Sequence, residues 1–213
     1  MSEKIFNLTR IRWKLENMIL DDIPKFEIVP KTTSFLMKVL SVILFFNRSF
    51  MTSYISVIYP RMYVPKLPWK ENDHYSAILV LAHEWVHLSD RKRFGLLFDI
   101  GYLFPQCLVF LSLLAPFLSW WWLLCLLFLL PIPSLTRAWL EYRAYSVTMA
   151  CMWWLNEIET NYYWIEIQFT GRWYYFMWPF KGIIRKMYER KLEMIKKDQL
   201  TSQERKIKEI IFS

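Results

Sequence analysis

The spacing of apolar residues in the first part of the chain predicts two helices. In residues 4–20 they recur every three or four positions, the period of a helix with one buried face. These positions are Ile5, Leu8, Ile11, Leu15 and Met18. Residues 35–46 are apolar except for Lys38, and this run is far shorter than the roughly 20 residues that cross a bilayer. We therefore expect a buried helix there.

A strand is predicted next. Residues 51–59 are rich in β-branched and aromatic side chains and stop at Pro60. Together with Pro65 and Pro68, this proline predicts a rigid, exposed connection that reaches Asp73.

The pattern becomes helical again over residues 75–93, where Asp73 can serve as N-cap and Gly95 ends the helix. This helix contains His83-Glu84-Trp85-Val86-His87, the motif HExxH. Residues four apart lie one above the other on a helix, so both imidazoles can bind one metal ion with Glu84 beside them. The motif predicts a Zn²⁺ site; the alternative is a core helix with two hydrogen-bonded histidines.

A catalytic zinc ion needs a third protein ligand and an open position for water. The only other histidine, His74, lies upstream, so an acidic residue must complete the site. We favour Glu141. Asp90, one turn after His87, is the alternative: it could bind the ion directly or hydrogen-bond a ligand imidazole from outside.

Glu141 belongs to a helix that Ser134 can cap, and this helix places Arg137 and Tyr145 on the same face as Glu141. The sequence Glu141-Tyr142-Arg143-Ala144 matches ExxA. With HExxH upstream, the chain resembles the zincin metallopeptidases whose third ligand is a glutamate. It also resembles the membrane zinc peptidases that include type I CaaX prenyl endopeptidases and bacterial heat-shock membrane proteases.

The resemblance covers roughly residues 50–150 and implies further features. Arg137 corresponds to an arginine that those peptidases carry shortly before the glutamate, and Tyr145 stands where they usually have aspartate. In zincins, a strand before the HExxH helix often pairs with an extended substrate. The resemblance implies this role for the strand at residues 51–59.

The composition indicates contact with a membrane or an extensive protein interface. Hydrophobic residues make up 55% of the 213 residues and aromatic residues 19%, and the net charge is +8. We expect peptide or protein substrates and membrane contact, and consider nucleic acid an unlikely partner because the aromatic segment has few interleaved basic residues. No secretory signal pattern is present at the N-terminus. Cys107, Cys125 and Cys151 lie in apolar surroundings at no metal-binding spacing, which favours buried thiols.

No charged residue lies between Asp99 and Arg137. A single membrane crossing by this stretch would leave His87 and Glu141 on opposite sides, unable to share one ion. We therefore predict a helical hairpin over residues 100–136 that turns near Pro116, either inserted shallowly in a membrane or covered by protein.

The resulting fold class is mainly α with a small β element: a zincin-like helical core with an edge strand and an apolar hairpin between the two ligand-bearing helices. We expect a single domain, 1–213. Its parts are an N-terminal helical region at 1–48, a metallopeptidase core at 49–150, an aromatic-rich segment at 151–180 and basic helices at 181–213.

The expected activity is zinc-dependent peptide hydrolysis with Glu84 as general base. Tyr145, Arg143 or His74 could stabilise the oxyanion, and the sequence does not choose among them. The second hypothesis is a structural or membrane-inserting protein of the virion type that keeps a zincin fold with little or no turnover.

Overall fold

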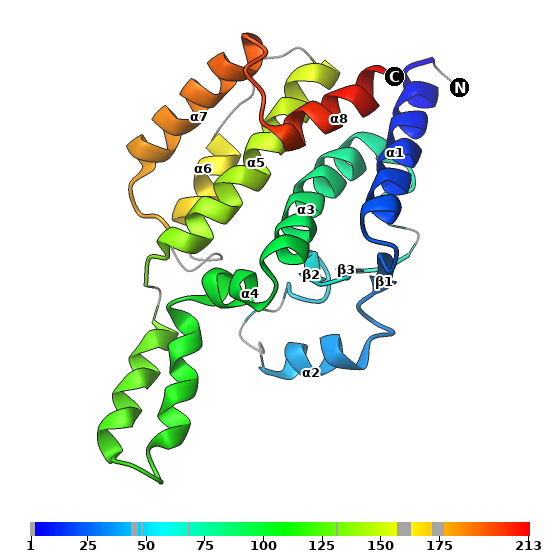
Figure 1. Cartoon of the computed structure of the whole chain (residues 1–213). Coiled ribbons are helices and arrows are strands. Elements are labelled where there is room, and N and C mark those ends of the chain that lie inside the picture. The colour runs from blue at the N-terminus through cyan, green and yellow to red at the C-terminus, as the bar shows by residue number, and fades with distance from the viewer. Residues whose placement is uncertain are drawn as a thin grey trace.

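The computed structural model describes residues 3–43, 47, 49–67, 69–130, 132–156, 163–171 and 177–213. The described part is mainly helical with one small sheet (Figure 1). This architecture confirms the mainly α fold class with a small β element.

Three long helices and the C-terminal helix form the main core. Helix α3 (His74–Phe94) packs against α1 (Glu3–Asp22) and α5 (Leu135–Asn156), while α8 (Ser202–Phe212) packs against α1 and α5. The predicted apolar stripe of α1 is confirmed, since Ile11 and Leu15 are buried in this core and Leu8 and Met18 pack against it. The side chain of Ile5 lies outside the described residues.

The sheet has the strand order β1-β3-β2, with β1 (Glu27–Pro30) parallel and β2 (Ser56–Ile58) antiparallel to β3 (Arg61–Val64). The strand predicted for residues 51–59 is present only as β2, at one edge of the sheet. The exposed connection predicted after Pro60 is wrong over residues 61–64, because these form β3, the central strand of the sheet; residues 66, 67 and 71–73 do lie in an exposed connection. The prolines around β3 obscure the strand in the sequence, although β3 pairs with both β1 and β2.

Helix α2 (Phe35–Ile43) lies where a helix was predicted, but the expectation that it is buried is wrong. Met37 is buried against Phe50 and Tyr63, whereas Phe35 and Val42 are 80% and 74% exposed. The hydrophobicity of α2 wrongly predicted burial because this apolar helix packs against the rest of the protein on only one face. Residues 44–46 of the predicted helix lie outside the described residues.

Beside α2, the Lys31 side chain is fully buried. Its Nζ donates a hydrogen bond of 2.7 Å to the carbonyl of Phe50 and lies 3.9 Å from the centre of the Phe50 ring. Burial lowers the pKa of Lys31 to about 8, because removal from water disfavours the ammonium. Lys31 therefore makes folding depend on pH.

Stability is expected to rise with pH above about 8 through Lys31. Between this value and the ordinary lysine pKa of about 10.4, the unfolded chain binds the extra proton, so deprotonation favours the folded state. The full effect is on the order of 3 kcal/mol. Lys31→Met should remove the rise, and Lys38→Met on an exposed side chain should keep it, in denaturant unfolding at pH 7, 9 and 10. An equal rise in all three proteins would contradict this prediction.

The predicted apolar hairpin is present and projects from the body (Figure 1). Helix α4 (Leu96–Leu103) leads into two 3₁₀ helices, η1 (Gln106–Leu114) and η2 (Trp120–Leu129), which pack against each other. The turn between them contains Pro116, as predicted. No single helix among the described residues has the length and apolarity to cross a membrane; α4 and η1 reach both only together, with a bend of 94° between them.

The C-terminal region contains two helices, as predicted: α7 (Lys181–Lys196) and α8, which Thr201 and Glu204 begin with a reciprocal capping box. Helix α6 (Tyr163–Thr170) packs against α7. Of the aromatic residues noted at 151–180, several lie outside the described residues, namely Tyr162, Trp173, Tyr174 and Tyr175.

Candidate metal centre

Helix α3 presents the HExxH residues from the middle of its length. The predicted ends of this helix are confirmed: the Asp73 carboxylate accepts a hydrogen bond of 3.0 Å from the backbone N–H of Ser76, and Gly95 follows the last residue with φ 58°. Gly95 adopts this left-handed conformation without the penalty that a Cβ would bring. The two caps fix the helix around His83 and His87.

Helix α5 brings Glu141 to the same place from a distant part of the chain. Ser134 begins this helix as predicted, because its hydroxyl accepts a hydrogen bond from the backbone N–H of Arg137. The same hydroxyl donates to the carbonyl of Phe104 at the start of the hairpin. The two ends of the hairpin therefore lie next to each other, which allows α3 and α5 to pack together.

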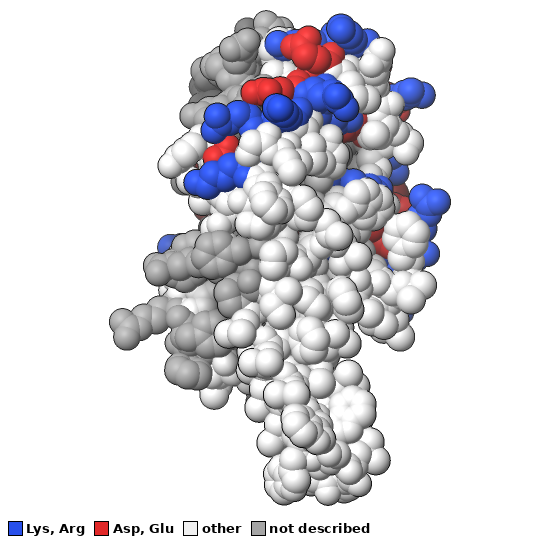
Figure 2. All heavy atoms as spheres, turned by 90° about the vertical axis from the view of Figure 1, so that its left-hand side faces the viewer, with Lys and Arg blue, Asp and Glu red and all other residues white. Residues whose placement is uncertain are grey.

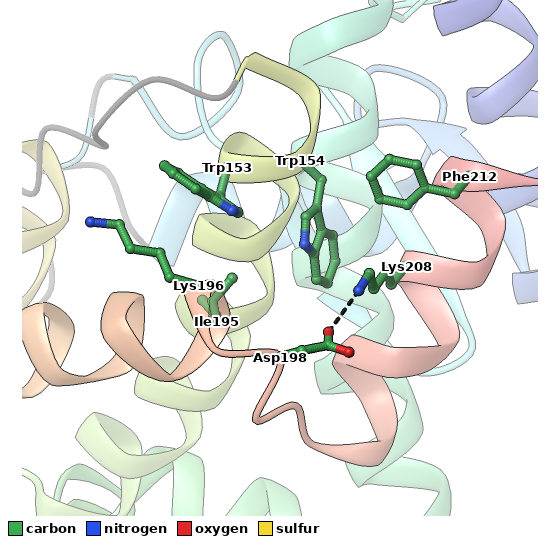
Figure 3. Close-up of a pocket in the computed structure, with 7 residues that line it drawn as sticks. All are labelled: Trp153, Trp154, Ile195, Lys196, Asp198, Lys208 and Phe212. Atoms are coloured by element: carbon green, nitrogen blue, oxygen red, sulfur yellow. Dashed lines mark hydrogen bonds and ion pairs between the residues drawn. The ribbon is translucent and has the colours of Figure 1, made fainter.

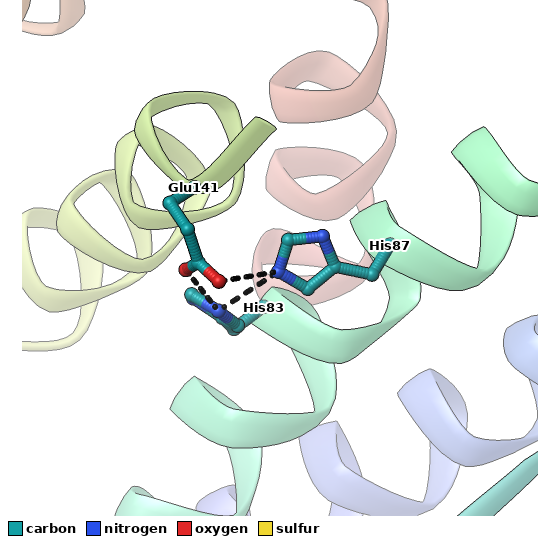
Figure 4. Close-up of side chains that lie close together, drawn as sticks. All are labelled: His83, His87 and Glu141. Carbon is teal, nitrogen blue, oxygen red and sulfur yellow. Dashed lines mark hydrogen bonds and ion pairs between the residues drawn. The ribbon is translucent and has the colours of Figure 1, made fainter. Parts of the chain in front are cut away.

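Three potential ligand atoms converge between these helices (Figure 4). The Nε2 atoms of His83 and His87 are 3.3 Å apart. His83 Nε2 lies 3.4 Å from Oε2 of Glu141, and His87 Nε2 lies 3.7 Å from Oε1. The structure therefore brings the two histidines and the favoured acidic residue together across a sequence separation of more than fifty residues.

These separations fit one tetrahedral metal ion. Donor atoms about 2.0–2.1 Å from a zinc ion lie about 3.3–3.4 Å apart at tetrahedral angles. Glu141 is only 2% exposed, yet its Oε2 accepts no hydrogen bond from any described residue. A buried carboxylate oxygen whose nearest partner is an imidazole nitrogen at 3.4 Å is poorly satisfied, and a cation between them would remove that cost. His83 is the most exposed of the three side chains at 13%, which leaves an open side for water or substrate.

Without a metal, the neighbouring imidazoles partly fill this role. Burial opposes ionisation of Glu141, but the neighbouring His87 and His83 outweigh it and hold the pKa of Glu141 well below its usual range. Burial likewise opposes a charge on His87, and the Glu141 carboxylate raises the pKa of His87 above its ordinary value. Protons and metal therefore compete for the same lone pairs.

Glu84 lies beside the cluster on α3 and makes no hydrogen bond or ion pair with any described residue. Burial raises the pKa of Glu84, and the Glu141 carboxylate raises it further, while His83 and His87 lower it. The net effect is an increase, which makes this carboxylate a better proton acceptor than an ordinary glutamate. A carboxylate that acts as a general base must be unpaired, and a raised pKa makes it a stronger base.

Tyr102 of α4 completes the surroundings of Glu141 and was not found by sequence reasoning. Its hydroxyl donates a hydrogen bond of 2.5 Å to Oε1 of Glu141, and its ring packs edge-on against His87. The bond fixes one carboxylate oxygen and leaves Oε2 for a metal ion. A single tyrosine has no characteristic spacing to the HExxH motif, so no sequence signal identified it.

Tyr102→Phe is expected to lower zinc affinity about 10–100-fold, the usual effect of losing an outer hydrogen bond to a ligand. The fold should persist, because the phenylalanine keeps the stacking against Phe98. Competition with a chromogenic chelator measures the affinity. Tyr142→Phe, whose ring packs on Tyr188 away from the cluster, is the matched control. Equal affinity in the Tyr102→Phe variant and the parent would exclude this role.

Asp90 and Arg143 bind each other rather than the cluster. Arg143 Nη1 donates a hydrogen bond of 2.6 Å to Oδ2 of Asp90, and Arg143 Nη2 donates one of 3.0 Å to Gln203. The hydrogen bond expected from Asp90 to a ligand imidazole is not formed, and His87 Nδ1 has no partner among the described residues. A buried carboxylate is better stabilised by a guanidinium than by a neutral imidazole. This pair joins α3 to α5.

Arg137 acts on the cluster indirectly. Its guanidinium lies 4.7 Å from the centre of the Tyr102 ring, on the tyrosine that holds Glu141. This cation–π contact places Arg137 next to Tyr102 and outside the converging ligand atoms.

Of the other two residues considered for the oxyanion, Tyr145 is near and His74 is far. The Tyr145 ring packs edge-on against His83 with 4.4 Å between ring centres, and Trp164 of α6 packs on its other side. His74 begins α3, nine residues before His83, which corresponds to about 13 Å along a helix. Tyr145 therefore stays a candidate by position, whereas His74 does not face the cluster.

A separate hollow of about 360 Å³ lies near the C-terminal end of α5 (Figure 3). Its lining includes Trp153, Trp154 and Phe212, together with Lys208, which forms an ion pair of 2.6 Å with Asp198. Trp153 is twelve residues beyond Glu141, about 18 Å along the helix. This hollow does not belong to the candidate metal centre.

The chain matches no protein-family model, no curated protein and no solved structure in comparisons with known proteins.

Proposed function

We propose that the protein is a zinc-dependent metallopeptidase whose ion is held by His83, His87 and Glu141. The observation that supports this most strongly is the convergence of three ligand atoms at separations of 3.3, 3.4 and 3.7 Å, with the next residue of the motif, Glu84, beside them. A bound zinc ion would acidify its water towards a pKa of about 7 and polarise the scissile carbonyl.

The residues of the chain supply the remaining steps. Glu84 accepts the proton of the attacking water and passes it to the leaving amine, with its raised proton affinity favouring the first transfer. Tyr102 holds Oε1 of Glu141 and so orients the carboxylate. Tyr145, whose ring packs edge-on against His83, is the residue that we assign to the developing oxyanion.

The experiment is elemental analysis of the purified protein followed by a peptidase assay on a fluorogenic peptide library. The expected result is one zinc ion per chain, and hydrolysis that stops with 1,10-phenanthroline and returns when zinc is added. Cleavage that survives complete metal removal would refute the proposal. One bound zinc with no cleavage of any library member would instead favour the structural alternative.

A further inference from the structure

The end of the molecule that carries the hairpin presents an apolar surface without charge. No charged residue occurs between Asp99 and Arg137, and the lower part of the molecule in Figure 2 shows no charged side chain on the hairpin. Phe117 at the tip is 83% exposed, and Trp120 and Trp121 are 75% and 77% exposed. Exposed apolar surfaces of this extent mark a place of contact with another phase or molecule.

The hairpin is exposed on all its sides, which distinguishes lipid from a protein partner. On η2 the exposed large apolar side chains follow nearly every position: Trp120, Trp121, Leu123, Leu124, Leu126, Leu127 and Leu129. A protein that docks on one face would leave the others in water. A helix that is apolar all round is typical of one surrounded by protein core or hydrocarbon, and the projecting hairpin has no core around it.

Several polar groups of the hairpin are hydrogen-bonded within it, although Oε1 of Gln106 at its base accepts no hydrogen bond from the described residues. The Ser112 hydroxyl donates to the carbonyl of Val109, and the Gln106 amide donates to the carbonyl of Ile132. Backbone groups of η1 and η2 are bonded within the 3₁₀ helices. Unpaired backbone groups are too costly inside a bilayer, so this helical hairpin is compatible with insertion.

Two more helices carry exposed apolar faces: α4 at the base of the hairpin, and α2 at the same end of the body (Figure 1). On α4 the exposed residues are Leu96, Leu97, Ile100, Leu103 and the adjoining Phe104; on α2 they are Phe35, Leu36, Val39, Val42 and Ile43. Both sets have the same spacing, which is one face of a helix. The opposite face of α2 packs on the sheet side through Met37, and the opposite face of α4 carries Tyr102 towards Glu141.

The directions and lengths of these elements fit insertion into one leaflet. Helix α4 and η1 meet at 94°, so η1 runs straight into a bilayer when α4 lies along its surface. At about 2.0 Å per residue, η1 and η2 are about 18–20 Å long, close to the thickness of one leaflet with its headgroup region, since the whole bilayer measures about 40–45 Å. The hairpin therefore enters without crossing, and both its ends stay on the side of the metal ligands.

We propose that the η1–η2 hairpin inserts into one leaflet of a lipid bilayer, with the exposed faces of α2 and α4 resting on the membrane surface. The candidate metal centre then lies about one helix diameter, roughly 10 Å, from the lipid. If the proposed peptidase function holds, its substrates are peptides anchored to that same membrane. The site then meets substrate chains that diffuse within the plane of the membrane, rather than chains that arrive from solution.

This attachment depends on apolar burial rather than charge. The basic C-terminal helices α7 and α8 lie at the end of the molecule opposite the hairpin (Figure 1), so they cannot rest on the same flat surface. Binding should consequently persist on neutral phosphatidylcholine vesicles at about 1 M NaCl, where the Debye length is only about 3 Å.

Vesicle flotation tests the insertion. The full-length protein should float with phosphatidylcholine vesicles in high salt, and Phe117→Asp should reduce the floating fraction at least about tenfold, since a carboxylate in hydrocarbon is strongly unfavourable. Phe6→Asp on α1 makes the same change at a side chain that is 63% exposed, far from the hairpin, and should float like the parent. Circular dichroism and zinc content confirm that both variants fold.

Three results would overturn the insertion: a parent that does not float, equal flotation of Phe117→Asp, or a lipid-free dimer that Phe117→Asp dissociates without any flotation of the parent. Flotation needs no hydrolysis, so this outcome is independent of the peptidase proposal. The substrate class is tested by one peptide sequence with and without a lipid anchor, on vesicles. Equal cleavage of both forms would refute it, whereas cleavage of neither would count against the peptidase function while leaving the insertion supported.

Discussion

Replacing Glu84 by glutamine is expected to abolish most peptide hydrolysis while the zinc content stays at one ion per chain. The variant keeps the size and hydrogen-bonding capacity of the side chain but cannot accept a proton. Since general-base catalysis contributes roughly 10²–10⁴-fold, kcat/KM should fall by this factor. Glu84 is not among the converging ligand atoms, so the metal site itself is untouched.

The pH dependence of the parent tests the same assignment. A general base must be deprotonated, so activity is lost as the pH falls through its pKa. The acid limb of kcat/KM should therefore report the pKa of Glu84, which burial raises above its ordinary value in the metal-free protein. Asp73→Asn changes an acidic residue on the same helix that only caps its start, and should leave kcat/KM within a few-fold of the parent. Wild-type rates in Glu84→Gln would rule out Glu84 as the base.

The long helices and their meeting point could be predicted because their signals are local and strong. Asp73 and Gly95 mark the ends of α3, and Ser134 marks the start of α5. The choice of Glu141 rested on elimination and on a helical face, and the structure places its carboxylate against both imidazoles. Whether a metal ion binds there stays a prediction.

The features that could not be predicted depend on contacts between residues that are far apart in the sequence. Strand β3 looks like a loop because prolines surround it, and only its pairing with β1 and β2 makes it a strand. Helix α2 looks like core because apolar composition does not say whether both faces have a partner. Tyr102 reaches Glu141 only because the hairpin returns to its starting point.

The hairpin connects these observations. Its departure from α4 and its return to α5 bring Tyr102 and Glu141 together, while Ser134 ties the two ends through the carbonyl of Phe104. The Thr136 hydroxyl adds a second tie of 2.5 Å to the carbonyl of Gly101. A displacement of the hairpin would therefore be transmitted to the carboxylate of the candidate site. The apolar projection and the candidate metal centre are thus joined by direct hydrogen bonds at the base of the hairpin.

Glu141→Gln is expected to lose zinc, because a neutral amide is a far weaker ligand than a carboxylate. The affinity should fall by more than the 10–100-fold that an outer hydrogen-bond partner contributes. For the parent, zinc at 1,000 times its dissociation constant should raise the free energy of unfolding by about 4 kcal/mol. At the same zinc concentration, the variant should gain only a small part of this stabilisation, which denaturant unfolding with and without zinc measures.

Asp90→Asn is the decisive comparison, since Asp90 was the other acidic residue that could complete the site. Its carboxylate is bound to Arg143, so its removal should disturb the packing of α3 on α5 but leave zinc affinity near that of the parent. The reverse pattern, with zinc lost in Asp90→Asn and retained in Glu141→Gln, would reassign the third ligand to Asp90. It would also require α3 and α5 to rearrange when the metal binds, because Arg143 would have to release the carboxylate first.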